Sequence, residues 1–440
     1  MFKSITILLY IIFAAQVLQA DTRINLIGTF PLSGGITDVW SYSDTINSKE
    51  YAIVGSYNGI WIIDVTDAGS PELVINMQEV PAFDFKIWKN YLYTVTGAPG
   101  TNQGMIIDLS SISAPVIAGY FNSAHNIYIT ENGYLLAEIP GLKIYNLNDN
   151  PLSPRLVFNS KDSEGHDAAL IGNRLYDFHG RDGTNIYDVS FGDSLIINLI
   201  GSINDPTISY HHSGWPSEDG NTLFICDELA VNPFPDVTAW DITDPANPKR
   251  IGGYIDSNAT IHNLYVIDEL AYTSHYTSGF KVLDVSDPAN ITVAAHFDTN
   301  PFSGDGFSGA FGVYPFSSSG NIFVSDDTGL YIFKVQNDAT PVQDNNSVKM
   351  YELHQNYPNP FNPSTIIKYN ITEPQHVSLK VFSTLGEEIK TLADGYQDAG
   401  EKIVEWDGTD NNGNKIAQGV YLYTLMAGEY KSTRKMILMK

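Results

Sequence analysis

Six polar residues recur at the start of successive units of a repeated pattern, and their side chains are of the types that bind metal ions. They are Asp38, Asp84, His125, His166, His212 and His262. Neutral imidazole and carboxylate groups are ligands that zinc, iron and manganese accept. We therefore predict a divalent transition metal at the four histidines, with the two aspartates as supporting residues. Asp167 follows His166 directly and could orient its ring.

Three further acidic residues come at or just after a second short strand of their units. They are Glu138, Asp227 and Glu228. If a metal were bound, any of them could act as a base on metal-bound water, so they are the candidate catalytic residues. A repeat copies structural residues as readily as functional ones. The histidines could therefore instead begin each strand by bonding the neighbouring unit.

The units that carry these residues predict an all-β fold. A glycine, an apolar strand ending in a polar residue, a turn and a second apolar strand recur, as in GIWIIDVTDAGSPELV from Gly59 and GFKVLDVSDPANITVAAHF from Gly279. Seven such units follow one another at intervals of 38 to 53 residues. A four-stranded sheet per unit at this period is typical of a β-propeller blade. Because the innermost strands of a propeller line its central channel, the histidines should meet at one mouth.

The two ends of the repeat region are complementary. The last unit stops after Val335 without an outer strand, whereas the segment INLIGTF from Ile24 resembles the outer strands of other units. We therefore expect residues 21–336 to form a seven-bladed β-propeller closed by the N-terminal strand, which leaves no exposed sheet edge. An open solenoid or two sandwiches is the alternative.

The N-terminus and the composition indicate export. An early lysine, an apolar run from Ile5 to Ala15 and a small residue before Asp21 predict a signal peptide at residues 1–20. No later segment is long enough for a transmembrane helix. The formal net charge of −26 argues against nucleic acid as a partner. We found no glycine-rich phosphate-binding loop, and so expect no organic cofactor.

The repeats resemble the LVIVD repeat, and the whole region resembles the choice-of-anchor B family. HNIYI at His125, HHSGWPSEDG at His211, HNLYV at His262 and YTSGFKVLDVSDP at Tyr276 carry this resemblance. It implies a propeller displayed on a bacterial surface, and it implies no reaction.

The C-terminal region has a different pattern. Residues 337–351 are polar and have the composition of a flexible linker. Short alternating strands between turns then predict a small β-sandwich over residues 352–440. This segment, with YPNPFNPSTIIKY from Tyr357 and GVYLYTL from Gly419, is similar to the type A sorting domain of type IX secretion, which is related to the Ig-like domain of the flagellar hook-capping protein. The similarity implies the type IX machinery as a partner; an ordinary Ig-like adhesion domain is the alternative.

Two functions follow from these features. The first is a secreted protein, extracellular or attached to the outer-membrane surface, that binds or displays a surface glycan, a protein or a small ligand at the channel mouth. The second is a metal-dependent extracellular hydrolase or lyase that uses the channel histidines.

Overall fold

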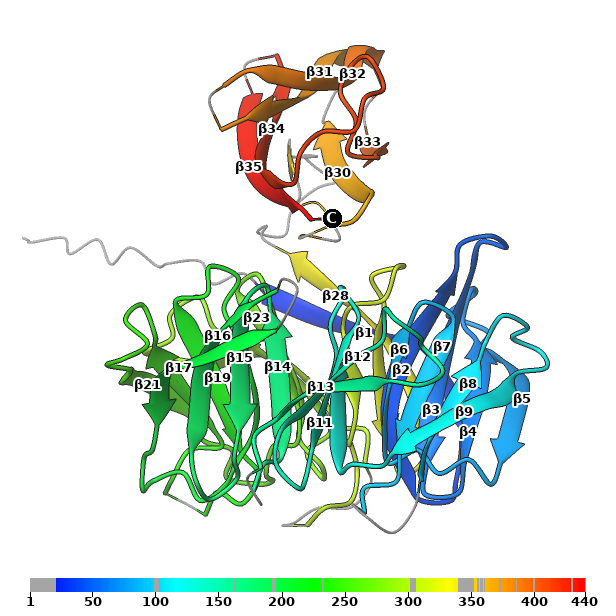
Figure 1. The fold of residues 1–440 in the computed structure, drawn as a ribbon, viewed down its shortest axis with the longest axis vertical. Helices are drawn as coiled ribbons and strands as arrows, with labels where there is room; N and C mark the ends of the chain where they lie inside the picture. The colour runs from blue at the N-terminus through cyan, green and yellow to red at the C-terminus, as the bar shows by residue number, and fades with distance from the viewer. Residues whose placement is uncertain are drawn as a thin grey trace, which may run out of the picture. The chain divides into compact units, whose positions relative to one another are not determined.

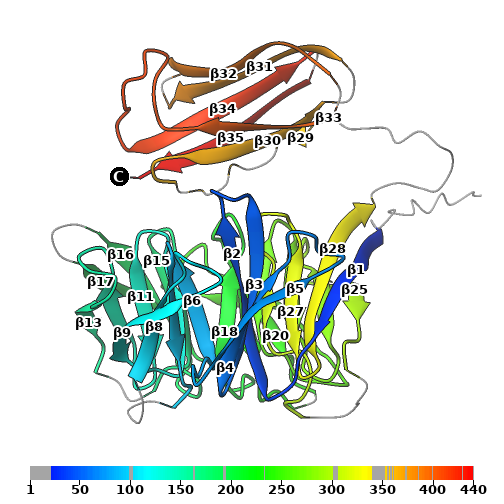
Figure 2. The same cartoon turned by 90° about the vertical axis from the view of Figure 1, so that its right-hand side faces the viewer.

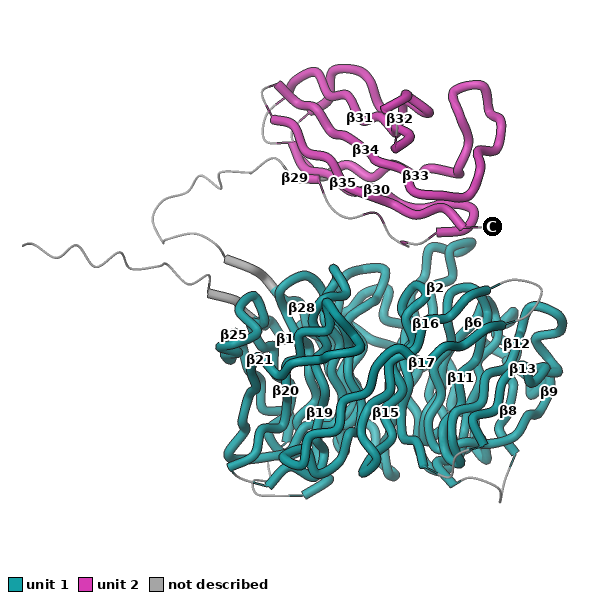
Figure 3. The backbone as a smooth tube through the Cα atoms, turned by 60° about the vertical axis from the view of Figure 1, so that its left-hand side comes forward, with its two compact units in different colours: residues 1–340 teal, residues 341–440 magenta. Residues whose placement is uncertain are grey.

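The chain divides into two compact units, Met1–Thr340 and Pro341–Lys440 (Figure 3). This computed structural model describes residues 21–338 and 352–439, apart from residues 99–102, 162–163, 192–194, 232, 301–305, 354–355, 357–358, 360, 372–373, 385, 399 and 429. The predicted signal peptide and residues 339–351 of the predicted linker lie outside the described residues. In the part described, no helix is long and apolar enough to cross a membrane.

The described strands of the first unit form seven antiparallel four-stranded sheets (Figures 1 and 2). The first three sheets are β2 (Ile36–Asp44), β3 (Lys49–Ser56), β4 (Gly59–Asp64), β5 (Glu72–Gln78); β6 (Asp84–Trp88), β7 (Tyr91–Val95), β8 (Gln103–Asp108), β9 (Val116–Asn122); and β10 (Asn126–Ile129), β11 (Tyr134–Glu138), β12 (Lys143–Asn146), β13 (Arg155–Asn159). The fourth and fifth are β14 (Asp167–Ile171), β15 (Arg174–Phe178), β16 (Thr184–Ser190), β17 (Ile196–Ile203); and β18 (His211–Pro216), β19 (Thr222–Asp227), β20 (Val237–Asp241), β21 (Lys249–Tyr254). The sixth and seventh are β22 (Leu264–Ile267), β23 (Leu270–Ser274), β24 (Phe280–Asp284), β25 (Thr292–Phe297); and β26 (Val313–Tyr314), β27 (Ile322–Asp326), β28 (Gly329–Asp338), β1 (Asp21–Pro31).

Burial explains why the second strands read as continuous apolar runs. All five residues of β27 are buried, and so are all but the first residue of β7 and β19. A strand covered on both faces has no reason to alternate apolar and polar residues. The outer strands β5 and β21 are exposed over much of their length. The sheets therefore pack face to face, with their outer edges toward solvent.

An apolar cluster fills each junction between consecutive sheets. Ile53 and Phe85 belong to the cluster between the first and second sheets, and Phe224 and Leu264 to the one between the fifth and sixth. The first strands of neighbouring sheets also contact one another, as β2 does β6 and β18 does β22. Four-stranded sheets packed side by side in this way form a β-propeller.

The N-terminal strand β1 is the outermost strand of the seventh sheet. It pairs antiparallel with β28 from Asp21 opposite Asp338 to Pro31 opposite Gly329 (Figure 2). β28 thus continues to Asp338, past the predicted boundary at residue 336. The seventh sheet also contacts the first sheet, where β26 and β27 approach β2.

The second unit is a β-sandwich. One sheet has the order β29 (Glu352–Leu353), β30 (Thr365–Ile371), β33 (Gly400–Trp406), and the other β32 (Glu388–Gln397), β31 (Gln375–Ser383), β34 (Gly419–Ala427), β35 (Tyr430–Leu438). Strand β31 alternates buried and half-buried residues, as a strand with one face on a core does. The core between the sheets includes Tyr369, Leu379, Trp406 and Tyr423.

Candidate functional site

A belt of six aromatic rings surrounds one end of the channel. The backbone N–H groups of Phe83, His166 and Phe311 each donate to a carbonyl of the second strand of their own sheet, as those of His125 and His262 do. These five residues therefore hold one repeat position, and the register of β18 gives His212 the same position in the fifth sheet. The ring centroids lie 4.9 Å apart for Phe83–His125, 4.7 Å for His125–His166, 4.1 Å for His166–His212, 4.8 Å for His212–His262, 3.9 Å for His262–Phe311 and 5.7 Å for Phe311–Phe83.

The prediction that Asp38 and Asp84 share the histidine position is wrong by one residue. Asp84 pairs with Val95 as Asp167 pairs with Phe178, so Asp84 corresponds to Asp167 and Phe83 corresponds to His166. Asp38 directly precedes Val39, where β2 shifts its register. These three aspartates all line the cavity next to the belt.

Hydrogen bonds fix the protonated nitrogen of each histidine. Nδ1 of His125, His166 and His262 lies 2.9, 3.1 and 2.7 Å from the backbone carbonyls of Gly97, His212 and Phe311, respectively. A carbonyl only accepts, so each Nδ1 carries the hydrogen and each neutral ring keeps a lone pair on Nε2. These bonds are the structural role that the repeat suggested. Because that role uses Nδ1 alone, Nε2 remains available as a ligand.

The same tautomer follows for His212. Its Nδ1 lies 3.1 Å from Ser213 Oγ, and that hydroxyl donates its only hydrogen to the carbonyl of His262 at 3.1 Å. The hydroxyl must therefore accept from Nδ1. Burial is the main cause that holds the pKa of His166 and of His212 well below the ordinary value, with neighbouring histidines adding to it. Both rings are neutral at physiological pH.

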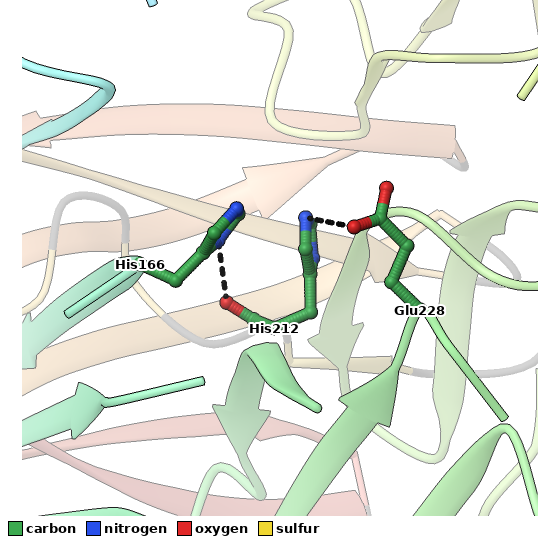
Figure 4. A group of neighbouring side chains, drawn as sticks. All are labelled: His166, His212 and Glu228. Atoms are coloured by element: carbon green, nitrogen blue, oxygen red, sulfur yellow. Dashed lines mark hydrogen bonds and ion pairs between the residues drawn. The ribbon is translucent and has the colours of Figure 1, made fainter. Parts of the chain in front are cut away.

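Glu228 completes a group that could hold a metal ion (Figure 4). It follows β19, and its Oε2 lies 3.5 Å from Nε2 of His212. One ligand atom from each of His166, His212 and Glu228 lies within 4.8 Å of the others, and this is the one such group among the described residues. His125 and His262 are outside it, although their rings belong to the belt. Tyr276 donates its hydroxyl to Oε1 of Glu228 and so orients the carboxylate.

The contact between Glu228 and His212 brings two hydrogen-bond acceptors together. Nε2 has no hydrogen when Nδ1 has one, and a carboxylate has none to give. A cation between the two atoms would satisfy both. Tetrahedral zinc with bonds of about 2.0–2.2 Å separates its ligands by roughly 3.4 Å, close to the 3.5 Å observed here.

The cavity beside the belt is small. It offers about 40 Å³ to water, and its lining includes all four belt histidines. One water needs roughly 10–15 Å³, whereas sites for drug-sized ligands measure about 300–1,000 Å³. The cavity thus has room for a few waters next to His166 and His212, and Glu228 lies outside its lining.

Carboxylates and one lysine form the next layer of the channel. Lys86 Nζ lies 2.9 Å from Asp38 Oδ2 and also contacts Asp84. Burial alone would lower the pKa of Lys86, but these two carboxylates outweigh it and raise the pKa. Burial raises the pKa of Asp84 to about 6 and that of Asp167 to about 7.

The other two candidate bases lie elsewhere. Glu138 ends β11, is buried, and is not among the residues that line the cavity. Burial, followed by the charge of Asp177, raises its pKa well above the ordinary value. The carboxylate of Asp227 accepts the backbone amides of Ser209, Tyr210 and Leu229, so it holds a loop in place.

Comparison with known proteins identifies both kinds of unit. The LVIVD repeat matches residues 44–79 and 262–299, and the FlgD Ig-like domain matches residues 363–430. No curated protein matches the chain significantly. The chain therefore contains LVIVD repeats within a β-propeller, followed by an FlgD Ig-like domain.

Similarity to solved structures is low. PorZ of Porphyromonas gingivalis, described as an essential bacterial surface component of the type IX secretion system, is 12% identical with a TM-score of 0.35 over 89% of this chain and 64% of PorZ. BamB from Moraxella catarrhalis is 8% identical, with a TM-score of 0.45 over 73% of this chain and all of that one. The Cps50 β-propeller domain of Myceliophteria thermophila is 10% identical, with a TM-score of 0.47 over 71% of this chain and all of that one. These values are too low to support a functional inference.

Proposed function

We propose that this chain is an exported cell-surface β-propeller that binds a divalent transition metal at the mouth of its channel. The ion is held by His166, His212 and Glu228, and zinc fits the nitrogen and oxygen ligands best. The observation that carries the proposal is the contact of 3.5 Å between the bare Nε2 of His212 and the carboxylate of Glu228. The Nδ1 bonds to backbone carbonyls are the outer contacts that metal-bound histidines usually make.

The propeller has seven blades in a closed ring. Three features support this part of the proposal. β1 supplies the fourth strand of the seventh sheet, the seventh sheet contacts β2, and an apolar cluster that contains Val54 and Phe323 joins these two sheets. A closed ring brings the histidines of four consecutive blades to one axis.

Export follows from both ends of the chain. Residues 1–20 have the pattern of a signal peptide, and residues 352–440 act as the sorting domain that the type IX machinery recognises. The match to the FlgD Ig-like domain at residues 363–430 supports this part of the proposal, because the sorting domain is related to that domain. The mature protein is extracellular or attached to the outer-membrane surface.

The geometry favours binding over catalysis. On the cavity side of His166 and His212, the volume of about 40 Å³ has no space for the substrate that a hydrolase or lyase would need beside the metal. Glu228 is engaged as a ligand, and the Asp227 carboxylate is engaged by three backbone amides. Burial raises the pKa of Glu138 well above its ordinary value, which disfavours the carboxylate form that a base needs. A surface glycan, protein or small ligand would therefore cover the mouth as a recognition partner.

Metal titration of the mature chain tests the proposal. After removal of metal with a chelator, calorimetric titration with Zn²⁺ should show one tight site per chain. His212→Ala and Glu228→Gln should each weaken it about 10-fold or more, while His296→Ala, which removes an exposed histidine of β25, should not. Absence of a tight site, or equal binding by all variants, would contradict the metal centre.

A further inference from the structure

A second hollow lies apart from the metal site, at the junction between the seventh and first sheets. It is a groove of about 490 Å³, within the range of sites for small molecules. One wall comes from the end of β1 and the turn after it, including Phe30 and Leu32. The other comes from β4 and β5, including Trp61, Asn76 and Gln78.

Strand pairing places an aromatic ring and two amides on one face of the groove. Trp61 pairs with Asn76, and Gly59 pairs with Gln78, so these four positions share one face of the sheet. Gly59 has no side chain on this face, and all four positions line the groove. Trp61 is half-buried, whereas Asn76 and Gln78 are exposed.

The side-chain amides and the indole N–H of the groove have no hydrogen-bond partners among the described residues, whereas the Ser56 hydroxyl donates to the carbonyl of Gly59. Within the described residues, no hydrogen bond is made by the side-chain amides of Asn58, Asn76 and Gln78 or by the indole N–H of Trp61. Amides both donate and accept, so they can match the hydroxyl groups of a ligand in either role.

Charge narrows the class of ligand. None of the twelve residues that line the groove is charged, on a chain whose formal net charge is −26. The surrounding field repels anions, and the groove contains no cation to hold one. A flat aromatic face beside uncharged amides suits a molecule with apolar C–H faces and many hydroxyl groups.

We propose that this groove binds a neutral oligosaccharide of hexose or pentose units, with one sugar ring stacked on Trp61 and its hydroxyl groups bonded to Asn76 and Gln78. The site is independent of the metal centre, because it shares no lining residue with the channel cavity.

Titration of the full mature chain with defined oligosaccharides tests this proposal. The probes are cellohexaose, laminarihexaose, maltohexaose, mannohexaose and xylohexaose, with oligogalacturonate as the acidic counterpart. At least one neutral probe should bind, and oligogalacturonate should not. Binding should be the same with EDTA and in His212→Ala, which separates this site from the metal centre. No binding of any neutral probe, or preferred binding of the acidic one, would overturn the proposal.

Substitutions in the groove test whether the oligosaccharide binds there. Trp61→Ala should weaken it about tenfold or more, as truncation of a central aromatic contact does. Asn76 is exposed on an outer strand, so Asn76→Ala should fold normally. Loss of the amide's hydrogen bonds to the oligosaccharide should weaken binding about three- to tenfold. Tyr120→Ala, which removes an exposed aromatic residue of β9, is the control and should bind like wild type. Unchanged binding in both Trp61→Ala and Asn76→Ala would place the ligand elsewhere and refute the groove.

Discussion

Lys86 balances two buried carboxylates, Asp38 and Asp84, at the centre of the channel. Lys86→Met keeps the stem of the side chain but leaves both carboxylates without their cation. Breaking a buried ion pair in this way costs about 3–5 kcal/mol. The free energy of unfolding in urea should fall by that amount. Lys49→Met breaks the more exposed pair with Asp64 and should cost much less, because solvent screens an exposed pair. Similar losses in both variants would contradict the role of Lys86.

Asp236 makes stability depend on pH in a defined direction. Burial, only partly opposed by the hydrogen bond from the Asp256 amide, raises its pKa from 3.8 to about 7. The folded state therefore keeps a proton that the unfolded state has lost between these values, so this residue reduces stability as the pH rises from about 4 to 7. Asp236→Asn retains an acceptor for the amide and removes the charge.

We expect this variant to match wild type near pH 4 and to be more stable at pH 8. The gain should be at most about 4 kcal/mol, since one pKa unit corresponds to about 1.4 kcal/mol. Denaturant unfolding of both proteins at several pH values measures it. A difference that does not change with pH would show that Asp236 titrates normally.

At the residue scale, the sequence predicted that the four histidine rings would lie together, and it placed the two aspartates one residue away from their actual position. His125, His166, His212 and His262 hold the same position in their repeat units. Where the strand register is intact, residues at equal positions lie at the same distance from the propeller axis, so the four rings lie together. Both aspartates lie one residue away from the histidine position. The reasons are the register shift in β2 for Asp38 and the presence of Phe83 at the histidine position for Asp84. The contact of Glu228 with His212 depends on the path of the chain after β19, which no periodic pattern records.

The outer strands carry glycines where the next sheet approaches. A Cβ atom at Gly252 would lie 1.9 Å from the carbonyl oxygen of Pro288, and one at Gly201 would lie 1.7 Å from that of Pro245. Gly28 of β1 has the corresponding relation to Ala68, at 2.0 Å. The N-terminal strand thus packs on the first sheet in the same way as other outer strands pack on their neighbours.

Gly252→Ala should therefore force two sheets apart. Backbone atoms cannot move aside as the end of a flexible side chain can, so we expect a loss of stability of about 1–3 kcal/mol. Gly69→Ala, whose nearest atom would be 3.4 Å away, is the matched control and should stay within about 0.5 kcal/mol of wild type. Thermal unfolding compares them, and an unchanged midpoint for Gly252→Ala would show that the sheets can separate freely.

The sequence identified the outer strands, but it did not show why they contain glycine. The recurring Ile-Gly pairs, as in RIGGY from Arg250 and LIGTF from Leu26, identified β1 as an outer strand. That the glycine admits a carbonyl from the next sheet required the three-dimensional structure.

For the whole molecule, the proposed export signal lies in residues 352–440. Deletion of this segment should leave the propeller folded but keep it in the periplasm of its host. Cell fractionation with antibodies against the propeller measures this, and fusion of residues 337–440 to a periplasmic reporter should carry the reporter to the surface. Surface delivery of the truncated protein would favour an ordinary adhesion domain.

Repeats made the overall architecture predictable. The repeated units predicted the four-stranded sheets, and the complementary ends of the repeat region predicted the pairing of β1 with β28. The groove beside Trp61 was not predicted, because its walls come from two segments, residues 30–34 and 56–78, and the repeat pattern does not record how the first segment packs beside the second.

Anomalous diffraction from crystals grown with Zn²⁺ would test the metal centre most directly. The account predicts one strong peak at the channel mouth, about 2.0–2.2 Å from Nε2 of His166, Nε2 of His212 and a carboxylate oxygen of Glu228. A map with no peak among these three residues, or with zinc only on the outer surface, would contradict it.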